Sequence, residues 1–375
     1  MLERLVACPS VTPEEAGVLD LLEAELAGLG FAVQRLRFEG DGSYPVDNLF
    51  ATRGTGGRRL LFAGHTDVVP PGELANWTGD PFTARQEDGK LFGRGTADMK
   101  SGIAAFVAAA SAIPADAGTV MLAITNDEEA DAVNGTAKLV DWMVREGHQF
   151  DFAVVGEPSS AAVLGDSIKI GRRGSLSGMV VITGVQGHVA YPERANNPLP
   201  ALARVVLALG APIDEGTAHF PASNLEVTTI DVGNAVSNVI PASGTIRFNI
   251  RFNDLWTPET LAAWVQERID TVALDGAEAR FTVSGTPSRA FLSPLSADVE
   301  TLCGAIEAVT GRRPQTSTGG GTSDARFIAP LGPVVECGLV GPSMHKADEH
   351  IAIADLLGLA EIYRRFMLDF FEATP

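Results

Sequence analysis

The sequence has few cysteines and no long apolar stretch. Cys8, Cys303 and Cys337 lie far apart and form neither a disulfide framework nor a CxxC metal pair, which is typical of a reducing compartment. No segment approaches the roughly 18 apolar residues of a membrane-spanning helix, and no basic stretch followed by an apolar one opens the chain. These absences predict a cytoplasmic protein without a membrane partner.

Basic residues are also scarce. There are 28 Lys and Arg against 47 Asp and Glu, which gives a net charge of −19. Such a chain repels nucleic acid and anionic membranes, so we expect neither as a partner. An anionic small molecule would have to be met by local arginines, and the few basic residues that cluster therefore become informative.

The length and the order of the patterns predict two domains in an α/β protein. A chain of 375 residues is long for a single core. Short apolar strands alternate with helical patterns in residues 1–174, which predicts a mostly parallel sheet, and a similar pattern returns in 288–375. Residues 175–287 are instead rich in β-like alternation with two helical segments. We expect a catalytic domain in two parts, 1–174 and 288–375, interrupted by a smaller α+β module at 175–287.

Two helices are predicted near the motifs discussed below. Thr12 is a typical N-cap residue, Pro13 fits the first helical position, and apolar residues then recur at helical spacing as far as Gly30. This pattern predicts a helix that begins at Thr12. Residues 101–113 are rich in alanine and apolar on most sides, which predicts a buried helix.

The most informative segment is GHTDVVP at 64–70, which follows an apolar run typical of a buried strand. His65 and Asp67 are two residues apart at the strand end and therefore project to the same side. An imidazole there can bind a metal while the carboxylate holds its tautomer. Taken alone, a structural histidine remains the more common explanation.

Further acids and a second histidine follow at similar places in the sequence. Asp98 precedes the alanine-rich segment, Glu128 and Glu129 follow an apolar strand, Glu157 follows another, and His345 comes late in the chain. Two of these signals have an alternative, since Asp98 could cap a helix and residues 127–129 could be a solvated loop. The carboxyl ends of parallel strands nevertheless meet at one crevice. Two imidazoles with several carboxylates suit two divalent ions that share a carboxylate, provided that one acid stays free as general base.

The ordered motifs resemble those of the dizinc amidohydrolase and metallopeptidase family, which includes acetylornithine deacetylase, aminoacylases and glutamate carboxypeptidase. The resemblance runs nearly the whole length of the chain. The segments that carry it are 64–70, 93–100, 127–129, 156–158 and 345–346, with support from 9–13, 171–175, 185–192, 238–241 and 320–324.

The resemblance implies a zinc-peptidase-like catalytic domain that binds two Zn²⁺ ions, one of them replaceable by Co²⁺. One metal would be held by His65 and Glu157 and the other by Glu129 and His345, with Asp98 bridging them. The implied reaction is hydrolysis of an N-acyl amino acid amide. The same scaffold could also carry a catalytically inactive binding or regulatory protein, but that reading predicts a missing ligand or base, and none is missing.

The resemblance also implies catalytic roles outside the ligand set. Asp67 would orient His65, and Glu128 would act as general base. His188, in the inserted module, would reach the active site of a partner subunit and stabilise the oxyanion, which implies a homodimer formed through that module.

For the substrate, Arg173 and Arg251 are expected to bind carboxylates, because guanidinium groups pair with them bidentately. The remaining expected contacts are Ser175, Tyr191, Asn238, Gly321, Thr322 and Ser323. Glu193 and the pair at 347–348 depart from the family pattern, and neither touches a proposed ligand.

Overall fold

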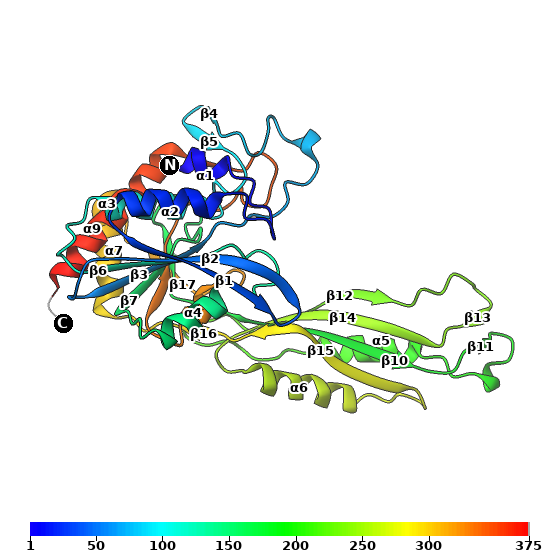
Figure 1. Ribbon diagram of the computed structural model, residues 1–375. Helices are drawn as coiled ribbons and strands as arrows, with labels where there is room; N and C mark the ends of the chain where they lie inside the picture. The colour runs from blue at the N-terminus through cyan, green and yellow to red at the C-terminus, as the bar shows by residue number, and fades with distance from the viewer. Residues whose placement is uncertain (374–375) are drawn as a thin grey trace. The chain divides into compact units, whose positions relative to one another are not determined.

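The computed structural model describes residues 1–373, which form two compact units (Figure 1). The first unit consists of Met1–Ile170, Ser293–Ser317 and the chain from Ser323 onward, and the second consists of Gly171–Leu292 and Thr318–Thr322. The second unit thus begins and ends slightly outside the expected range of 175–287, and it also takes in a short turn from the later part of the chain.

An eight-stranded mixed sheet forms the centre of the first unit, with the strand order β1-β2-β6-β3-β7-β18-β8-β17. The adjacent strands β6, β3, β7 and β18 run parallel, while β1 and β2 are antiparallel additions at one edge. The strands are β1 Ala32–Gly40, β2 Ser43–Arg53, β3 Arg59–His65, β6 Thr119–Thr125, β7 Phe152–Val155, β8 Ser167–Lys169, β17 Gln315–Ser317 and β18 Val334–Glu336. This arrangement confirms the predicted α/β class with a mostly parallel main sheet.

Helices pack around this sheet. Helix α9 contacts both α3 and α7, and α4 packs against β2, β6 and α8. The alanines of α3 are mostly buried and permit close packing, and a Cβ on Gly102 of this helix would lie only 2.4 Å from the carbonyl oxygen of Gly156. The helices are α1 Leu2–Val6, α2 Val18–Gly28, α3 Lys100–Ser111, α4 Thr136–Arg145, α7 Ala297–Thr310, α8 Ala325–Ile328 and α9 Ile353–Glu372.

The helix predicted to begin at Thr12 is wrong in its start, because α2 begins at Val18. Thr12 instead lies in a loop, where its N–H donates to the carbonyl of Val68 at 3.3 Å. Glu15 caps the start of α2 instead, because its carboxylate accepts hydrogen bonds from the N–H groups of Gly17 and Leu19 at 2.9 and 2.5 Å. The predicted alanine-rich helix is confirmed as α3, one residue earlier at its start.

A small antiparallel sheet in the first unit lies next to the ligand-bearing loops. It contains β4 Arg85–Glu87, β5 Lys90–Phe92 and β19 His350–Ala352 in the order β19-β5-β4, and a short helical turn, η1, covers Leu74–Asn76.

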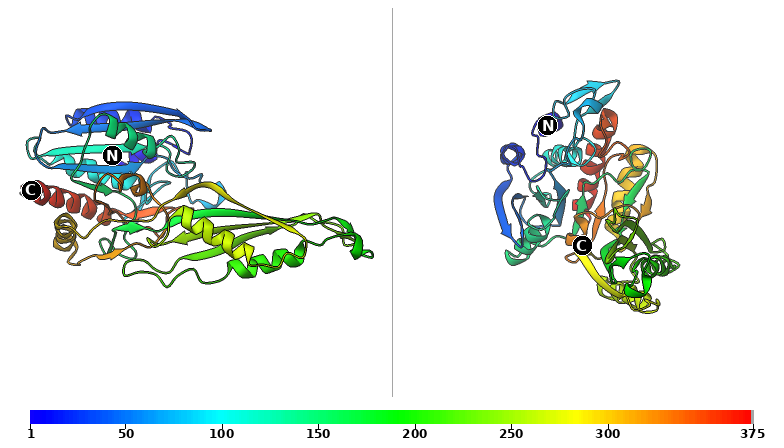
Figure 2. Two further views of the ribbon diagram at one scale, coloured as in Figure 1. Left: turned by 90° about the horizontal axis from the view of Figure 1, so that it is seen from below. Right: turned by 90° about the vertical axis from the view of Figure 1, so that its right-hand side faces the viewer.

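The second unit is a four-stranded antiparallel sheet with two helices on one face (Figure 2). Buried and partly exposed residues alternate along β10, so one face of the sheet packs against the helices and the other does not. Glycines on the packed face make room for aromatic rings: a Cβ on Gly174 would lie 2.2 Å from the ring of Phe252. The elements of this sheet and its helices, in spatial order, are β12 Asn224–Asp231, β14 Ser243–Phe252, β10 Gly174–Thr183 and β15 Glu278–Ser288, with α5 Leu199–Leu209 and α6 Pro258–Asp270.

Shorter elements complete the second unit. Strand β11 Gly187–His188 pairs with β13 Val239–Ile240, β9 Gly171–Arg172 pairs with β16 Phe291–Leu292, and the turn η2 spans Pro192–Arg194. Across residues 1–373, no helix has both the length and the apolar character needed to cross a membrane.

Candidate metal centre

The neighbouring parallel strands β6, β3 and β7 end at one edge of the first unit's sheet, where an imidazole and several acids lie at or just after their last residues. His65, the last residue of β3, pairs in register with Thr125, the last residue of β6. Ala63 of β3 pairs with Val155, the last residue of β7. Strands β3 and β6 therefore end at the same level and β7 ends two residues earlier, so the three segments that follow begin at one edge of the sheet. This is the edge at which open α/β sheets bind ligands.

One group of donor atoms comprises His65, Asp98 and Glu157, whose ligand atoms all lie within 4.8 Å of one another. Nε2 of His65 is 3.1 Å from Oδ1 of Asp98 and 3.5 Å from Oε1 of Glu157. All three side chains are buried. An imidazole nitrogen and two carboxylates converging in this way are ligands suited to a divalent cation such as zinc.

A second group shares Asp98 with the first. Nε2 of His345 is 3.0 Å from Oε1 of Glu129 and 3.4 Å from Oδ2 of Asp98, and these three residues also offer ligand atoms within 4.8 Å. The two imidazoles therefore face different oxygens of one carboxylate. This is the donor arrangement that two cations with a bridging carboxylate require.

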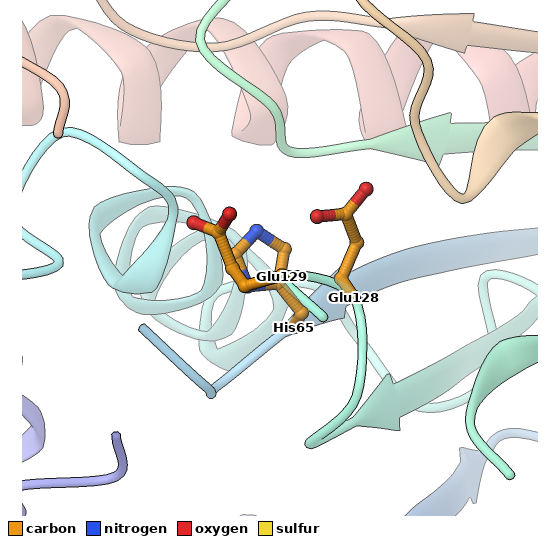
Figure 3. A group of neighbouring side chains, drawn as sticks. All are labelled: His65, Glu128 and Glu129. Atoms are coloured by element: carbon orange, nitrogen blue, oxygen red, sulfur yellow. The ribbon is translucent and has the colours of Figure 1, made fainter. Parts of the chain in front are cut away.

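Glu128 and Glu129 are neighbours in the chain, but their side chains diverge. Figure 3 shows the carboxylate of Glu129 beside the ring of His65 and that of Glu128 on the other side of the ring. Glu128 also offers an oxygen to a group with His65 and Glu129, although it belongs to neither group that contains Asp98.

Burial and mutual repulsion shift the pKa values of the acids in the cluster. Burial raises the pKa of Glu157 to about 7, and the charge of Asp98 adds to this effect. Burial likewise raises the pKa of Glu128, with the charge of Glu157 second in size. Burial also tends to raise the pKa of Asp98, but hydrogen bonds from His345 and His65 outweigh it and hold that pKa well below its ordinary value. Hydrogen bonds to Asp98 and Glu129 raise the pKa of His345 to about 10. Bound cations would offset the repulsion among these carboxylates, so the donor set fits a dinuclear centre.

Asp67 is fully buried and lies behind the centre. Its Oδ2 accepts hydrogen bonds from the backbone N–H groups of Glu128 and Glu129, each at 3.0 Å, and from the hydroxyl of Thr12 at 2.9 Å. The Nδ1 atom of His65 is 3.0 Å from the backbone carbonyl of Asp67 and 3.5 Å from its carboxylate. Asp67 thus contacts the ring that it was expected to orient, and it also holds the backbone of both glutamates.

Two buried acids near the centre, Asp324 and Glu349, were not predicted from the sequence as site residues. Asp324 accepts a hydrogen bond from the hydroxyl of Thr136 at 2.6 Å, and burial raises its pKa to about 6. Glu349 forms a buried ion pair with Arg94. Asp324 lies inside the segment 320–324 that carries part of the family resemblance, so its place there was an available signal, whereas Glu349 lies three residues beyond the segment 345–346.

The expected carboxylate-binding arginines lie in the second unit. Arg173 donates to Oδ1 of Asn224 at 3.0 Å, and its Nε atom is buried without a hydrogen-bond partner. Burial lowers the pKa of Arg251, and the positive charge of Arg173 adds to this effect, so the two guanidinium groups act on each other. Ser175 pairs in register with Arg251 and accepts from the amide of Asn249 at 3.1 Å.

His188, Tyr191 and Asn238 come together at the small β11–β13 ladder of the second unit. Nδ1 of His188 accepts from the N–H of Ala190 at 3.0 Å, and its ring centroid lies 5.7 Å from that of Tyr191. The backbone carbonyl of Asn238 accepts from Val189 at 3.1 Å. All three side chains are exposed.

The turn at 321–323 is divided between the two units. Gly321 and Thr322 belong to the second unit, where Gly321 is exposed and Thr322 half-buried, whereas Ser323 belongs to the first and is only 1% exposed. The hydroxyl of Ser323 donates to the buried carboxylate of Glu336, so it is already engaged inside the first unit.

Comparison with protein families gives one match that covers most of the chain. The model of Peptidase family M20/M25/M40 matches residues 61–369. This range spans every residue of both donor groups.

Curated relatives match over nearly the full length. A succinyl-diaminopimelate desuccinylase of Methylobacterium sp. (strain 4-46) is 52% identical over 100% of this chain and 96% of its own length. One of Rhodospirillum centenum (strain ATCC 51521 / SW) is 54% identical over 96% of this chain and 94% of its own.

Solved structures share the fold at lower identity. The M20 family metallo-carboxypeptidase Sso-CP2 from Sulfolobus solfataricus superimposes with a TM-score of 0.78 at 16% identity, covering 99% of this chain and 98% of the other. The aminopeptidase PepT from Bacillus cereus ATCC 10987 also gives 0.78, at 22% identity, covering 98% and 96%. A dinuclear metal-binding M20 peptidase from Bacillus subtilis gives 0.72 at 15% identity, covering 99% and 96%.

Proposed function

Because this chain belongs to peptidase family M20/M25/M40, we propose that it is a metal-dependent amidohydrolase acting on N-succinyl-LL-2,6-diaminopimelate. The products would be succinate and LL-2,6-diaminopimelate, in the synthesis of diaminopimelate and lysine. The curated desuccinylases support the choice of substrate, and the observation that carries the chemistry is the pair of donor groups sharing Asp98.

The proposed metal ligands are His65 and Glu157 for one ion, Glu129 and His345 for the other, and Asp98 for both. When bound, two Zn²⁺ ions would polarise the scissile carbonyl and lower the pKa of a water molecule. Co²⁺ could replace one of them, because the donors are imidazole and carboxylate groups that suit either metal.

Glu128 is the proposed general base. The backbone N–H of Glu128 donates a hydrogen bond to Asp67. The carboxylate of Glu128 diverges from that of Glu129. It would take a proton from the attacking water as the water oxygen adds to the amide carbon. The same proton would then pass to the nitrogen as the C–N bond breaks, so that the amine leaves and the acyl group departs as succinate.

Residues of the second unit are proposed to recognise the substrate. Arg173 and Arg251 would pair with its carboxylates, supported by Ser175, Tyr191 and Asn238. The turn formed by Gly321, Thr322 and Ser323 would supply further contacts. His188 would donate to the developing oxyanion in the active site of a second copy of the chain, within a cytoplasmic homodimer.

Steady-state kinetics of the zinc-loaded protein test this proposal. We expect release of succinate from N-succinyl-LL-2,6-diaminopimelate with a kcat/KM about 100-fold or more above that for N-acetylornithine, because only the first substrate presents the additional carboxylates. Protein stripped of metal by a chelator is the control and should be inactive. A higher kcat/KM for N-acetylornithine would instead identify an acetylornithine deacetylase or a related N-acyl amino acid hydrolase. No activity on either substrate would indicate an inactive binding protein.

A further inference from the structure

Glu349 lies four residues after His345, and its carboxylate is directed at the loop that carries Asp98. Its Oε1 accepts from the backbone N–H groups of Ala97 at 2.8 Å and Asp98 at 3.2 Å. Its Oε2 accepts from the N–H of Gly95 at 3.1 Å. One buried carboxylate thus accepts hydrogen bonds from three backbone N–H groups within residues 95–98, the loop that carries Asp98.

Arg94 completes this arrangement. Its Nη1 donates to Oε2 of Glu349 at 2.6 Å and lies 3.4 Å from the carbonyl of Lys346, while Nη2 donates to the carbonyl of Pro70 at 3.3 Å. Both members of the ion pair are almost fully buried. The pair therefore joins the three segments that carry His65, Asp98 and His345.

The local backbone requires such support. Gly95 has φ +82°, and a Cβ there would lie 2.7 Å from Val68, so the loop takes a path that only glycine permits. His345 and Asp348 are not glycines, yet they have φ values of 62° and 53°. Non-glycine residues in the left-handed region persist only when surrounding contacts determine their conformation.

We propose that Glu349 is a positioning residue of the metal centre, setting the separation between Asp98 and His345 and so the spacing of the two metal positions. This inference rests on the metal ligands proposed above. Glu349 belongs to none of the donor groups and acts only through the backbone of 95–98 and through its own segment. Residues that orient metal ligands in this way commonly contribute about 10- to 100-fold to metal affinity, and we expect a contribution of this size from Glu349.

Titration of metal-depleted protein with Zn²⁺ alone, followed by calorimetry, tests the role of Glu349. Glu349→Gln keeps the shape but places an amide NH₂ against backbone N–H donors and the guanidinium group. We expect about tenfold or greater loss of affinity for at least one Zn²⁺. The fall in turnover should appear in kcat, with KM little changed, because the proposed substrate contacts lie elsewhere.

Asp166→Asn is the matched control. Asp166 also holds three backbone N–H groups, those of Ala161, Ala162 and Val163, at 2.7 to 3.1 Å. These groups lie four to six residues beyond Glu157, and none of them belongs to a donor group. The Zn²⁺ affinity of Asp166→Asn should stay within about twofold of the unaltered protein, because the carboxylate of Asp166 accepts from the N–H groups of 161–163 and not from that of a proposed ligand.

The outcomes separate this inference from the proposed function. If the unaltered protein takes up no Zn²⁺, the proposed function fails, and the inference fails with it. If it binds two Zn²⁺ and Glu349→Gln binds them equally tightly, the positioning role alone is overturned. Should Glu349→Gln not fold, the double variant Arg94→Gln/Glu349→Gln leaves no unpaired buried charge and is judged by the same titration.

Discussion

The donor cluster of the first unit and the arginine-bearing sheet of the second differ in how their polar groups are satisfied. Next to the cluster, the buried acids Asp67 and Glu349 accept hydrogen bonds from backbone N–H groups of the ligand-bearing loops. In the second unit, Arg173 has a buried Nε without a partner, and His188 and Tyr191 are exposed. Hydrogen bonds tie the ligand-bearing loops of the first region together, although Nε of Arg94 and Oδ1 of Asp324 are buried there without a partner among residues 1–373. The exposed side chains of the second unit fit the proposed contacts with a substrate or with a second copy of the chain.

This difference indicates that metal binding depends on the first unit and substrate recognition on the second. Metal ligands need fixed separations, and strand ends tied by hydrogen bonds provide them. Groups that recognise a substrate and respond to its charge need free donors. Substitutions in the cluster should therefore change metal binding and kcat, and substitutions in the second unit should change KM or depend on a second copy of the chain.

The largest effect should come from Glu128→Gln. Loss of the proton acceptor should lower kcat by about 10³-fold, within the usual range for general-base catalysis, while bound zinc stays at two ions per chain by elemental analysis. Glu129→Gln is the contrasting variant, because it should lose metal. Near-normal turnover in Glu128→Gln would remove this residue from the base role.

His188→Ala should lower kcat by about 10²-fold, as expected for loss of an oxyanion donor. Co-expression with Glu128→Gln tests whether the histidine acts across a dimer. Each variant alone is nearly inactive, but in a mixed dimer one of the two sites has both groups if His188 comes from the partner. Isolated mixed dimers should therefore regain about one half of full activity, and an unseparated mixture of randomly paired subunits about one quarter. No recovery in isolated mixed dimers would place His188 in its own subunit's site.

Asp67→Ala should lower activity by about 10- to 100-fold, because it releases the backbone of both glutamates as well as His65. Thermal unfolding followed by circular dichroism should show that the fold persists. Thr12→Val is the matched variant, as it removes only one hydrogen bond to the same carboxylate and should cost about 1 kcal/mol of stability with little loss of activity. Equal activity losses in the two variants would contradict the positioning role of Asp67.

The smallest effect is expected from Arg251→Met, which keeps the apolar stem and removes the charge. KM should rise about tenfold with kcat nearly unchanged, since the lost contact is with substrate carboxylates. Arg247→Met is a suitable control, because Arg247 lies on the same strand outside the expected contacts. A fall in kcat with KM unchanged would show that Arg251 acts on the reaction and not on recognition.

Much of the donor cluster could be predicted from the sequence because strand ends are local features. An apolar run followed by His65, or by Glu128 and Glu129, marks the edge of a parallel sheet without knowledge of the fold. Glu349 could not be assigned its contacts in this way, because the loop at 94–98 is about 250 residues away in sequence, and the groups at 95, 97 and 98 that Glu349 holds are backbone N–H groups.

The start of α2 illustrates a second limit. Thr12 and Pro13 fit the usual pattern of a helix start, but the hydrogen bond from Thr12 to Val68 and the capping contacts of Glu15 determine the outcome. Tertiary contacts thus overrode local preference. The class of the sheet was predictable because the alternation of strands and helices extends over long stretches of chain.

The most direct test of the central claim is an anomalous difference map from crystals of the zinc-loaded protein, measured at the zinc absorption edge. The account predicts two peaks, one beside His65 and Glu157 and one beside Glu129 and His345, with Asp98 between them. A single peak, or peaks away from Asp98, would contradict a dinuclear centre bridged by this residue.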